Sequence, residues 1–510
     1  MSPKKIKFLL FSFIFILSAS GVFVPNFLPK ASGQNQFALF SLSEMPQKKF
    51  DETSSAAVRE SQININLTGF TRENSDVLSF PLFDGKTYEA VRDQDENIEI
   101  RGAGDFTWRG KLSDAGKPGG DVILTVKKGF VSGLIYAPNA VFEIIPRKNK
   151  QILIEINQNA FPECGGAIQP SQIEANAPQT ERNHAATTTV QVDSGDRIDV
   201  LIVYTTAVKN FLGGDAQAQV FAQQAVAATN TAYRNSQIRQ RLRLAHAREI
   251  VFTESGAAGT DLSNFGVNAE VNVLRETHQA DLVGLIVNSM DACGIGYVMN
   301  NVGTNFAPFG YTVTARSCAI GNLSLAHEFG HNMGSGHNPE NSNEAGFSYS
   351  HGHFLDGVFR TVMSYSEPCA AGCRRVPYFS NPFALFEGHL TGVADQRDNV
   401  RSINNTADTT ANFRYSGSNL TLNDFRKGER IQRKTAKIIS WSSENVKGNV
   451  RIEISHDGGA SYTVLKAETA NDGAETVNIF GRATRLGRFR IVSVENPSVS
   501  DSSVHNIVIR

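Results

Sequence analysis

This sequence has almost no excess of charge of either sign, and it lacks long apolar runs. Lys and Arg number 49 against 50 Asp and Glu, which gives a formal net charge of −1 over 510 residues. A chain so close to neutrality has no general attraction to nucleic acid or to an anionic membrane surface. No segment reaches the roughly 20 apolar residues that a membrane-spanning helix needs. We therefore expect no nucleic-acid partner and no stable insertion into a membrane.

Cysteine is also scarce, with five residues in the chain. Cys293, Cys318, Cys369 and Cys373 fall in one region and can form two disulfides in an oxidising compartment. The paired CxxC spacing that structural zinc sites use is missing, which disfavours a zinc ion on these four residues. Of the three pairings we expect Cys293–Cys318 and Cys369–Cys373, because the second pair closes a tight loop. The odd number leaves Cys164 without a partner.

The N-terminus has the composition of a Sec-type signal peptide. Three lysines within the first seven residues precede an apolar run from Phe8 to Leu17, and small residues follow at 18–20. This order of basic, apolar and small residues is typical of an export signal. We expect residues 1–20 to be removed and the protein to be secreted. An uncleaved signal-anchor is the alternative.

The most informative segment, residues 327–337, fits the pattern HExxHxxGxxH at every specified position. His327 and His331 are four residues apart, so on a helix both imidazoles face one metal ion. Gly334 permits a left-handed backbone angle that ends the helix, and the chain can then bring His337 to the same ion. Three nitrogen ligands leave one position of a tetrahedral zinc ion open, which is the pattern of a catalytic site. We expect one catalytic Zn²⁺.

Glu328 follows the first of these histidines. Its carboxylate would lie beside the metal, where it can take a proton from a water molecule and is not needed as a ligand. The motif therefore predicts a hydrolase that acts on peptide bonds, with proteins or peptides as substrates. The sequence does not decide whether Ca²⁺ binds.

The extended motif, with Thr-Val-Met-Ser-Tyr at 361–365, resembles the metzincin clan of zinc endopeptidases. The segment from Cys293 to Pro382 is similar to secreted bacterial reprolysin-like and peptidyl-Asp-type metallopeptidases. Tyr365 matches a tyrosine that in some metzincins reaches the zinc or the developing oxyanion. The resemblance implies roles for five further residues: zinc ligands His327, His331 and His337, general base and acid Glu328, and Met-turn residue Met363.

The alternative is a non-catalytic secreted adhesion or binding protein that uses the zincin fold as a scaffold. Inactive relatives usually lose the glutamate or a ligand of the motif. Neither is missing here, so we favour an active protease.

Cys164 stands in the segment Phe-Pro-Glu-Cys-Gly-Gly at 161–166, well upstream of the zinc motif. A thiolate binds zinc better than water does, so a cysteine held over the metal would silence the enzyme. The segment resembles the cysteine switch of reprolysin-type and matrix-type propeptides, which implies a latent zymogen. The alternative is a small buried core residue.

Composition divides the rest of the chain. Residues 34–166 have alternating apolar segments and are expected to form a β-rich propeptide that carries the cysteine switch. Residues 167–195, rich in Ala, Gln, Asn, Pro and Thr, predict a linker that contains the activation site. Alternating strands and helices over 196–415 suit an α/β metzincin catalytic domain. Short strands with Asp-Gly turns over 419–510 predict an all-β sandwich of immunoglobulin or fibronectin type III kind.

The C-terminal sandwich shows no catalytic constellation. We expect Trp441 to be its core aromatic residue. Substrate or surface binding is the preferred role, and a passive stabilising appendage is the alternative.

Some residues of the catalytic region are expected to shape the substrate site. Tyr311 to Thr314 can form the edge strand that binds an extended substrate, and the zinc helix is expected to begin at an N-cap of Asn322 or Ser324. Arg374 and Arg375 follow the Met-turn, in the loop that shapes the pocket for the residue after the scissile bond in metzincins. A guanidinium that faces this pocket would give an acidic preference, whereas an exposed dibasic pair is the alternative.

His351 and His353 stand two apart in a glycine-rich loop. Such histidines are more often exposed to solvent, so we do not expect a second metal site there.

Overall fold

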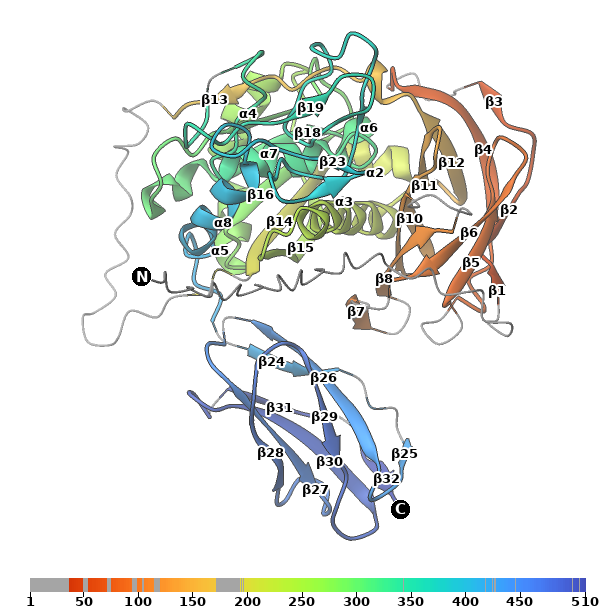
Figure 1. Ribbon diagram of the computed structural model, residues 1–510, viewed down its shortest axis with the longest axis vertical. Coiled ribbons are helices and arrows are strands. Elements are labelled where there is room, and N and C mark those ends of the chain that lie inside the picture. The colour runs from red at the N-terminus through yellow and green to blue at the C-terminus, as the bar shows by residue number, and fades with distance from the viewer. Residues whose placement is uncertain are drawn as a thin grey trace, which may run out of the picture.

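The computed structural model describes the chain in segments. These are residues 36–48, 54–70, 75–93, 99–102, 105–113, 120–170, 193, 195, 197–342, 344–417, 419–423, 425, 428–444, 446–497, 499–503 and 505–510. The predicted signal peptide and most of the predicted linker lie outside the described residues. Figure 1 shows three regions: an N-terminal β domain in red and orange, a mixed domain from yellow to cyan, and a C-terminal β domain in blue.

The N-terminal β domain is one strongly curved 12-stranded sheet (Figure 1). Its strand order is β1-β5-β6-β8-β9-β10-β11-β12-β4-β2, with β3 on β4 and β7 on β8. Trp108 is fully buried inside it and donates from Nε1 to the Ser75 carbonyl at 2.8 Å. The strands are β1 Gln36–Ala38, β2 Phe40–Leu42, β3 Gln47–Lys48, β4 Ala57–Ile65, β5 Val77–Pro81, β6 Thr87–Arg92, β7 Glu99–Gly102, β8 Asp105–Leu112, β9 Asp121–Lys127, β10 Phe130–Tyr136, β11 Val141–Arg147 and β12 Lys150–Ile156.

The mixed domain contains a six-stranded sheet in the order β13-β17-β18-β16-β14-β15. Two of its inner strands, β14 and β16, are mostly apolar, as expected of strands that helices cover on both faces. The strands are β13 Ala167–Ile168, β14 Arg197–Thr205, β15 Arg241–Ile250, β16 Leu282–Val287, β17 Gly294–Tyr297 and β18 Tyr311–Ala315. The helices are α2 Thr206–Leu212, α3 Asp215–Asn235, α4 Ala258–Gly266, α5 Ala269–Thr277, α6 Arg316–Ala319, α7 Ser324–Asn332 and α8 Asn399–Thr410.

The expected edge strand at Tyr311 to Thr314 was wrong. This segment is β18, which pairs with β16 on one side and with antiparallel β17 on the other. The edge strand of the mixed domain's own sheet is β17, whose sequence Gly-Ile-Gly-Tyr carries little β propensity. A side chain at Gly294 would collide with the Glu328 carboxylate, so the strand needs glycine in order to approach the zinc helix.

The remaining short elements lie around and below the zinc helix. They are 3₁₀ helices η2 Gln158–Ala160 and η3 Thr304–Phe309, and strands β19 Phe354–Leu355, β20 Phe359–Arg360, β21 Arg374–Arg375, β22 Leu385–Phe386 and β23 His389–Leu390. In the described part of the chain, no helix has the length and apolarity to cross a membrane.

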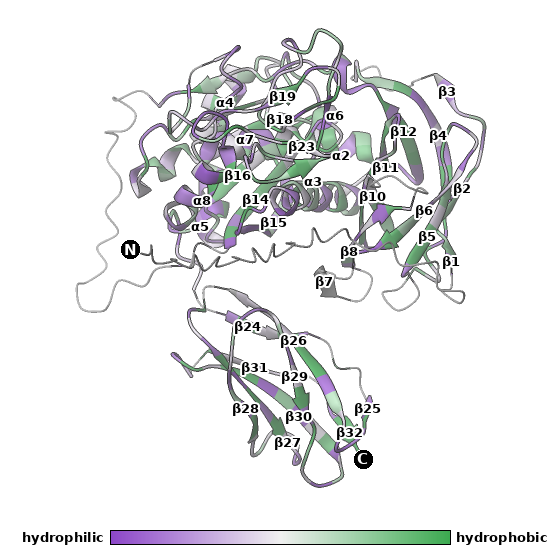
Figure 2. Cartoon of the chain, in the orientation of Figure 1, coloured by the Kyte–Doolittle hydropathy of each residue, from purple (hydrophilic) through white to green (hydrophobic). Residues whose placement is uncertain are grey.

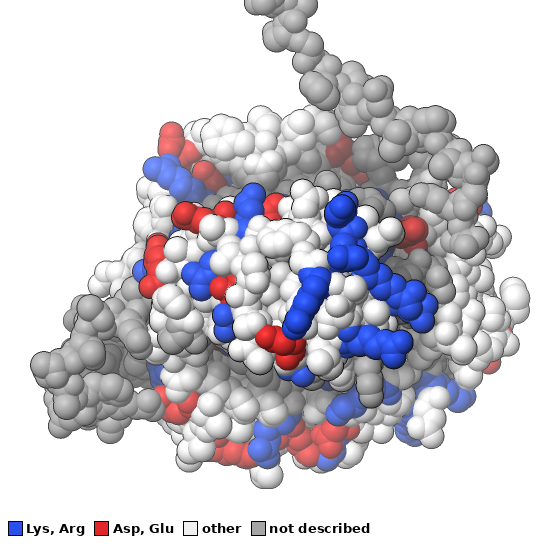
Figure 3. All heavy atoms as spheres, turned by 90° about the horizontal axis from the view of Figure 1, so that it is seen from below, with Lys and Arg blue, Asp and Glu red and all other residues white. Residues whose placement is uncertain are grey.

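The C-terminal β domain has two sheets, β24-β26-β29 and β25-β32-β30-β27-β28 with β31 on β30. Trp441 is buried between them and donates to Asn471 Oδ1 at 2.8 Å. Figure 2 shows apolar residues along these strands, and Figure 3 shows basic and acidic side chains on the face seen from below. The strands are β24 Asn419–Leu422, β25 Arg430–Ile431, β26 Ala436–Glu444, β27 Val450–Ser455, β28 Thr463–Thr469, β29 Ala474–Asn478, β30 Thr484–Ser493, β31 Ser500–Ser502 and β32 Ile507–Ile509.

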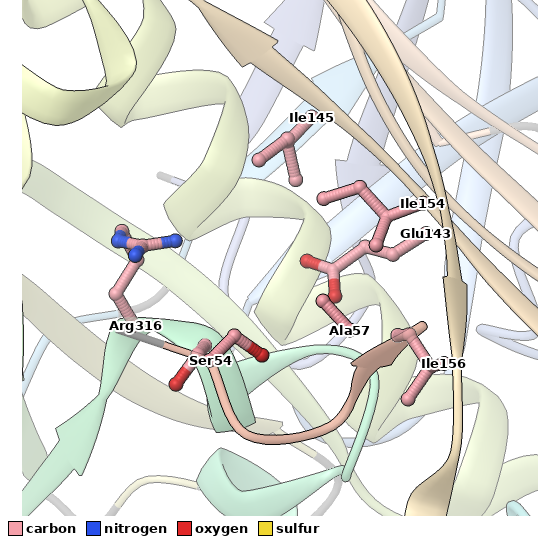
Figure 4. Close-up of a pocket in the computed structure, with 8 residues that line it drawn as sticks. Ser54, Ala57, Glu143, Ile145, Ile154, Ile156 and Arg316 are labelled. Atoms are coloured by element: carbon pink, nitrogen blue, oxygen red, sulfur yellow. The ribbon is translucent and has the colours of Figure 1, made fainter. Parts of the chain in front are cut away.

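The N-terminal β domain packs directly on the mixed domain. A single apolar cluster includes Tyr136 and Ile154 from the first and Phe221 from the second. A cavity of about 10 Å³ remains at this contact, lined by Glu143 of β11 and Arg316 of α6 among others (Figure 4). It has room for about one water molecule and none for a substrate.

Candidate active site

The helix α7 carries His327 and His331, and both side chains are buried. The helix begins at Ser324, one of the two expected starts, but the expectation that Asn322 or Ser324 would be its N-cap was wrong. Leu323 takes that position with a left-handed φ of 56° and no capping side chain. Asn322 donates instead to the Ser324 hydroxyl at 3.1 Å. The helix therefore begins at Ser324.

The end of α7 follows the sequence pattern. Gly334 has a left-handed φ of 82°, and its N–H donates to the His331 carbonyl at 2.9 Å. The Ser335 N–H donates to the Gly330 carbonyl at 2.9 Å. These two bonds end the helix, and the reversed chain brings His337 back to the two helical histidines.

The three histidines converge on one point. His337 Nε2 lies 3.1 Å from His327 Nε2 and 3.0 Å from His331 Nε2. Bond lengths of about 2.0 to 2.1 Å to a tetrahedral zinc ion would separate two ligand nitrogens by about 3.3 Å. The spacing of the three nitrogens therefore fits a zinc ion.

Hydrogen bonds fix the tautomers of the two helical histidines. Nδ1 of His327 lies 2.8 Å from the Val362 carbonyl, and Nδ1 of His331 lies 2.8 Å from the Ser335 carbonyl. A carbonyl can only accept, so both Nδ1 atoms carry the proton and both Nε2 lone pairs face the common point. Burial lowers the pKa of His331 to about 4, and it lowers the pKa of His327 further below the ordinary range. Neutral, convergent imidazoles are the state that a metal ion requires.

Glu328 is buried beside this point. Burial raises the pKa of its carboxyl group to about 8. Cys164 Sγ lies 3.6 Å from Glu328 Oε2 and 3.9 Å from His331 Nε2. The sulfur and the three histidine nitrogens all fall within 4.8 Å of one another, so the structure brings together the predicted ligands, base and switch.

Met363 and Tyr365 lie against the same site. Met363 is fully buried, and a side chain at Gly330 would come within 2.6 Å of its sulfur. The lack of a side chain at Gly330 thus leaves room for the Met-turn beneath the point on which His327, His331 and His337 converge. We call this position the metal point. The Tyr365 ring centroid lies 4.3 Å from that of His337, and its hydroxyl donates to the Cys164 carbonyl at 3.2 Å.

The segment around Cys164 extends the sheet at β17. The Cys293 N–H donates to the Glu163 carbonyl at 3.1 Å, and the Gly165 N–H donates to the Gly294 carbonyl at 2.8 Å. The segment then continues as β13, which runs parallel to β17. It therefore occupies the edge at which an extended peptide could bind.

Both expected disulfides are present in the structure. Cys293–Cys318 links the start of β17 to α6, and Cys369–Cys373 closes the loop after the Met-turn. Cys164 is the free cysteine.

The two arginines after the Met-turn have different environments. Arg375 is buried and donates to the carbonyls of Asn322 at 2.9 Å and Ser364 at 3.1 Å. Arg374 lies nearer the surface, where it pairs with Glu387 at 3.1 Å. Of the two arginines, Arg375 is therefore the one whose side chain points into the protein.

No motif in the sequence pointed to Arg360. The short parallel pairing of β20 with β21 sets Arg360 directly beside Arg375. Its side chain is 1% exposed and donates to the Ser364 carbonyl at 2.9 Å. Its position just before the Met-turn segment was the one available signal.

The expected exposure of His351 was wrong. It is 6% exposed, and its Nδ1 lies 2.9 Å from the His337 carbonyl. An isolated bridge between Gly336 and His351 holds this loop against the third histidine. His353 is partly buried, and burial lowers its pKa to about 4. Neither residue belongs to the convergent cluster.

Comparison with known proteins gives the same type of site. Residues 194–380 match the Reprolysin_5 model of metallo-peptidase family M12. A peptidyl-Asp metalloendopeptidase of Stenotrophomonas maltophilia is 29% identical over 78% of this chain and 94% of its own length. A protein of the same name from Xanthomonas campestris pv. campestris is 29% identical over 65% of this chain and 80% of its own length. One from Pseudomonas aeruginosa is 31% identical over 46% of this chain and 43% of its own length.

The family match covers the segment that holds the three histidines and Glu328, and the first relative aligns along nearly its whole length. The mixed domain is therefore a bacterial reprolysin-like metallopeptidase domain of family M12, and the protein is a metalloendopeptidase.

Proposed function

We propose that the protein is a zinc-dependent endopeptidase, exported as a latent zymogen, with a preference for an acidic residue next to the scissile bond. The observation that carries the catalytic part is the convergence of His327, His331 and His337 through their Nε2 atoms, with Glu328 beside them. Those three nitrogens would hold the zinc ion.

The catalytic roles would be shared between the zinc ion and side chains of the protein. A bound zinc ion would polarise the scissile carbonyl and stabilise the negative charge that develops there. Glu328 takes a proton from the attacking water and passes it to the leaving amine. Burial in a dry site favours this transfer, because a carboxylate with a raised pKa is a stronger base. Tyr365 would donate its hydroxyl proton to the developing oxyanion once the segment over the site has left.

The latent state rests on Cys164. Its sulfur stands where a fourth ligand would be, since it is 3.9 Å from His331 Nε2 and tetrahedral Zn–S and Zn–N bonds predict about 3.6 Å. The backbone of the same segment fills the edge of β17. We therefore treat the N-terminal β domain as a prodomain, with export by residues 1–20 and an activation cut between 167 and 195.

The acidic preference rests on two supports. The relatives named above are called peptidyl-Asp metalloendopeptidases. Arg375 also presents a buried positive charge below the turn after Tyr365.

The C-terminal β domain is proposed to bind substrate or a surface. The assignment of this domain to the immunoglobulin or fibronectin type III kind of sandwich stays a prediction. Its role in binding also stays a prediction.

Casein hydrolysis tests the catalytic part. The chain cut between 167 and 195 should hydrolyse casein, lose activity with a zinc chelator and regain it with added Zn²⁺. A non-catalytic adhesion protein would give no hydrolysis under any of these conditions.

Cys164→Ser tests the latent part. The uncut variant should hydrolyse small peptides, because the metal point opens to water while the N-terminal domain stays in place. If the uncut variant is as inactive as the uncut wild type, and cutting alone activates the protein, then the N-terminal domain inhibits only by covering the site.

A further inference from the structure

Two buried guanidinium groups lie side by side below the active site without a carboxylate partner. Arg360 and Arg375 are 1% and 2% exposed, and neither forms an ion pair with any described residue. Their Nη atoms donate only to backbone carbonyls, and both Nε atoms lack a partner in the described part of the chain. Two buried cations without an ion-pair partner are costly, so an anion placed next to them would stabilise both.

The local fold forces the pair together. The β20–β21 bridge puts Arg360 and Arg375 in register, and both side chains donate to the one carbonyl of Ser364. The Cys369–Cys373 disulfide ends directly before β21 and fixes the start of that strand. Because Ser364 follows Met363, the pair lies just beyond the Met-turn.

The acidic residue with the largest electrostatic effect on both arginines comes from the segment that covers the site. Glu163 precedes Cys164, and its Oε1 accepts from the Ser366 N–H at 2.8 Å and from the Ser366 hydroxyl. Its negative charge opposes the lowering of the pKa of both Arg360 and Arg375 that burial causes. The covering domain also supplies the Gln158 carbonyl, which accepts from Arg360 Nη2 at 3.4 Å.

We infer that Arg360 and Arg375 form the pocket for an acidic substrate side chain, and that Glu163 occupies this pocket as a pseudosubstrate next to the Cys164 sulfur. This inference rests on the proposed peptidase function. The covering segment then blocks the site twice, at the metal point and at the specificity pocket.

The direction of the segment explains why it can fill the pocket without presenting a cleavable bond there. It runs parallel to β17, with Glu163 beside Cys293 and Ala167 beside Gly296. A peptide bound antiparallel to β17 would instead place the residue after its scissile bond at the position of Glu163. The same pocket thus serves a substrate in one direction and the covering segment in the other.

Peptide binding tests the inference without relying on activity. Labelled octapeptides with the sequence of residues 161–168 carry Cys164→Ser, so that no sulfur can bind the metal, with Glu163 kept or changed by Glu163→Gln. Fluorescence anisotropy gives their Kd for the proteolytically activated chain. The glutamate peptide should bind at least about tenfold more tightly, because a charge-assisted hydrogen bond is lost in the other.

Variants of the chain assign the effect. Arg375→Gln and Arg360→Gln should reduce the ratio of the two Kd values to less than about threefold. Arg374→Gln, in the same loop but paired at the surface with Glu387, is the matched control and should keep it. Arg375→Lys, which retains the charge, should keep part of the preference and guards against misfolding of the glutamine variants.

Two results would overturn the inference: equal binding of both peptides to the wild-type chain, or a ratio that survives both glutamine variants. A chain that binds the glutamate peptide through Arg375 but cleaves no peptide would refute the peptidase function and leave the anion pocket standing. A chain that is an active peptidase but binds both peptides equally would refute the anion pocket and leave the peptidase function standing.

Discussion

The two β domains that flank the catalytic domain are attached in different ways. The N-terminal one shares an apolar cluster with it, in which Tyr136 and Phe221 both take part. Polar contacts cross the same boundary: Gln224 donates to the Ile123 carbonyl at 3.1 Å and Gln158 to the Gly321 carbonyl at 2.8 Å. The apolar cluster of the C-terminal domain lies wholly within residues 420–509.

This difference separates a domain that acts on the site from one that only accompanies it. Residues 163–168 of the N-terminal region reach the metal point and the edge of β17, and the charge of Glu163 acts on the arginine pair. A domain with its own closed core needs no such contact in order to fold. We therefore expect changes in the first domain to alter activity and changes in the second to leave it unaltered.

The largest effect should come from the catalytic domain itself. Glu328→Ala removes the base and leaves all three histidines, so kcat should fall by about 10²- to 10⁴-fold while the metal stays bound. Peptide hydrolysis by the activated chain and metal analysis of the same sample measure the two quantities. Glu367→Ala, which removes an exposed carboxylate near the Met-turn, is the control. Residual activity within tenfold of wild type would reject Glu328 as the base.

The two tryptophans of the β domains provide a matched pair. Trp108→Ala and Trp441→Ala each remove a buried indole and should each destabilise their own domain by about 3 to 5 kcal/mol. Only Trp108→Ala should raise peptide hydrolysis by the uncut chain, because only that domain covers the site. Calorimetry and a peptide assay on the uncut variants compare the pair. An equal gain of activity in Trp441→Ala would remove the distinction between the two domains.

A smaller effect on activity is expected from a change at Tyr365, which contacts the N-terminal region and also lies beside the catalytic residues. Its hydroxyl donates to Cys164 in the covered state and would be free for the oxyanion after activation. Tyr365→Phe should lower kcat of the activated chain with little change in KM, since the donor acts only in the transition state. The loss should be less than the roughly 2.7 to 4 kcal/mol of a principal oxyanion donor. Tyr349→Phe, whose hydroxyl accepts from Asn405, is the control, and kinetics equal to wild type would reduce Tyr365 to a packing residue.

Local patterns predicted the centre of the site, and long-range pairing decided what they missed. His327, Glu328 and His331 belong to one helical turn, and Gly334 ends it, so their arrangement follows from backbone geometry. Arg360 joins the site only because β20 pairs with β21, which sets it in register with Arg375 further along the chain.

Two further errors have the same origin. The strand β17 escaped prediction because two of its four residues are glycine, and one of them, Gly294, is required by the approach to Glu328. His351 was expected in solvent because its loop is rich in glycine, whereas a bridge to Gly336 buries it.

The smallest predicted effect concerns pH and a histidine pair outside the site. His246 of β15 and His278 after α5 stack with ring centroids 4.1 Å apart. Burial lowers the pKa of both, and His278 lowers that of His246 further. In the window between the lowered folded pKa values and about 6.5, the unfolded chain binds more protons than the folded one. Stability from this pair is therefore complete above about pH 6.5 and is lost as the pH falls below it.

His278→Phe keeps an aromatic ring in the stack and removes one titrating group and its effect on His246. The drop in Tm of the catalytic domain between pH 7 and pH 5 should consequently be smaller in this variant than in wild type. Calorimetry at the two pH values measures it, and the transition of the C-terminal domain in the same scan is the internal reference, because that domain contains neither member of the pair. An identical drop in variant and wild type would contradict a contribution of this histidine pair to the pH dependence of stability. A change confined to the C-terminal transition would contradict the separation of the domains on which the comparison depends.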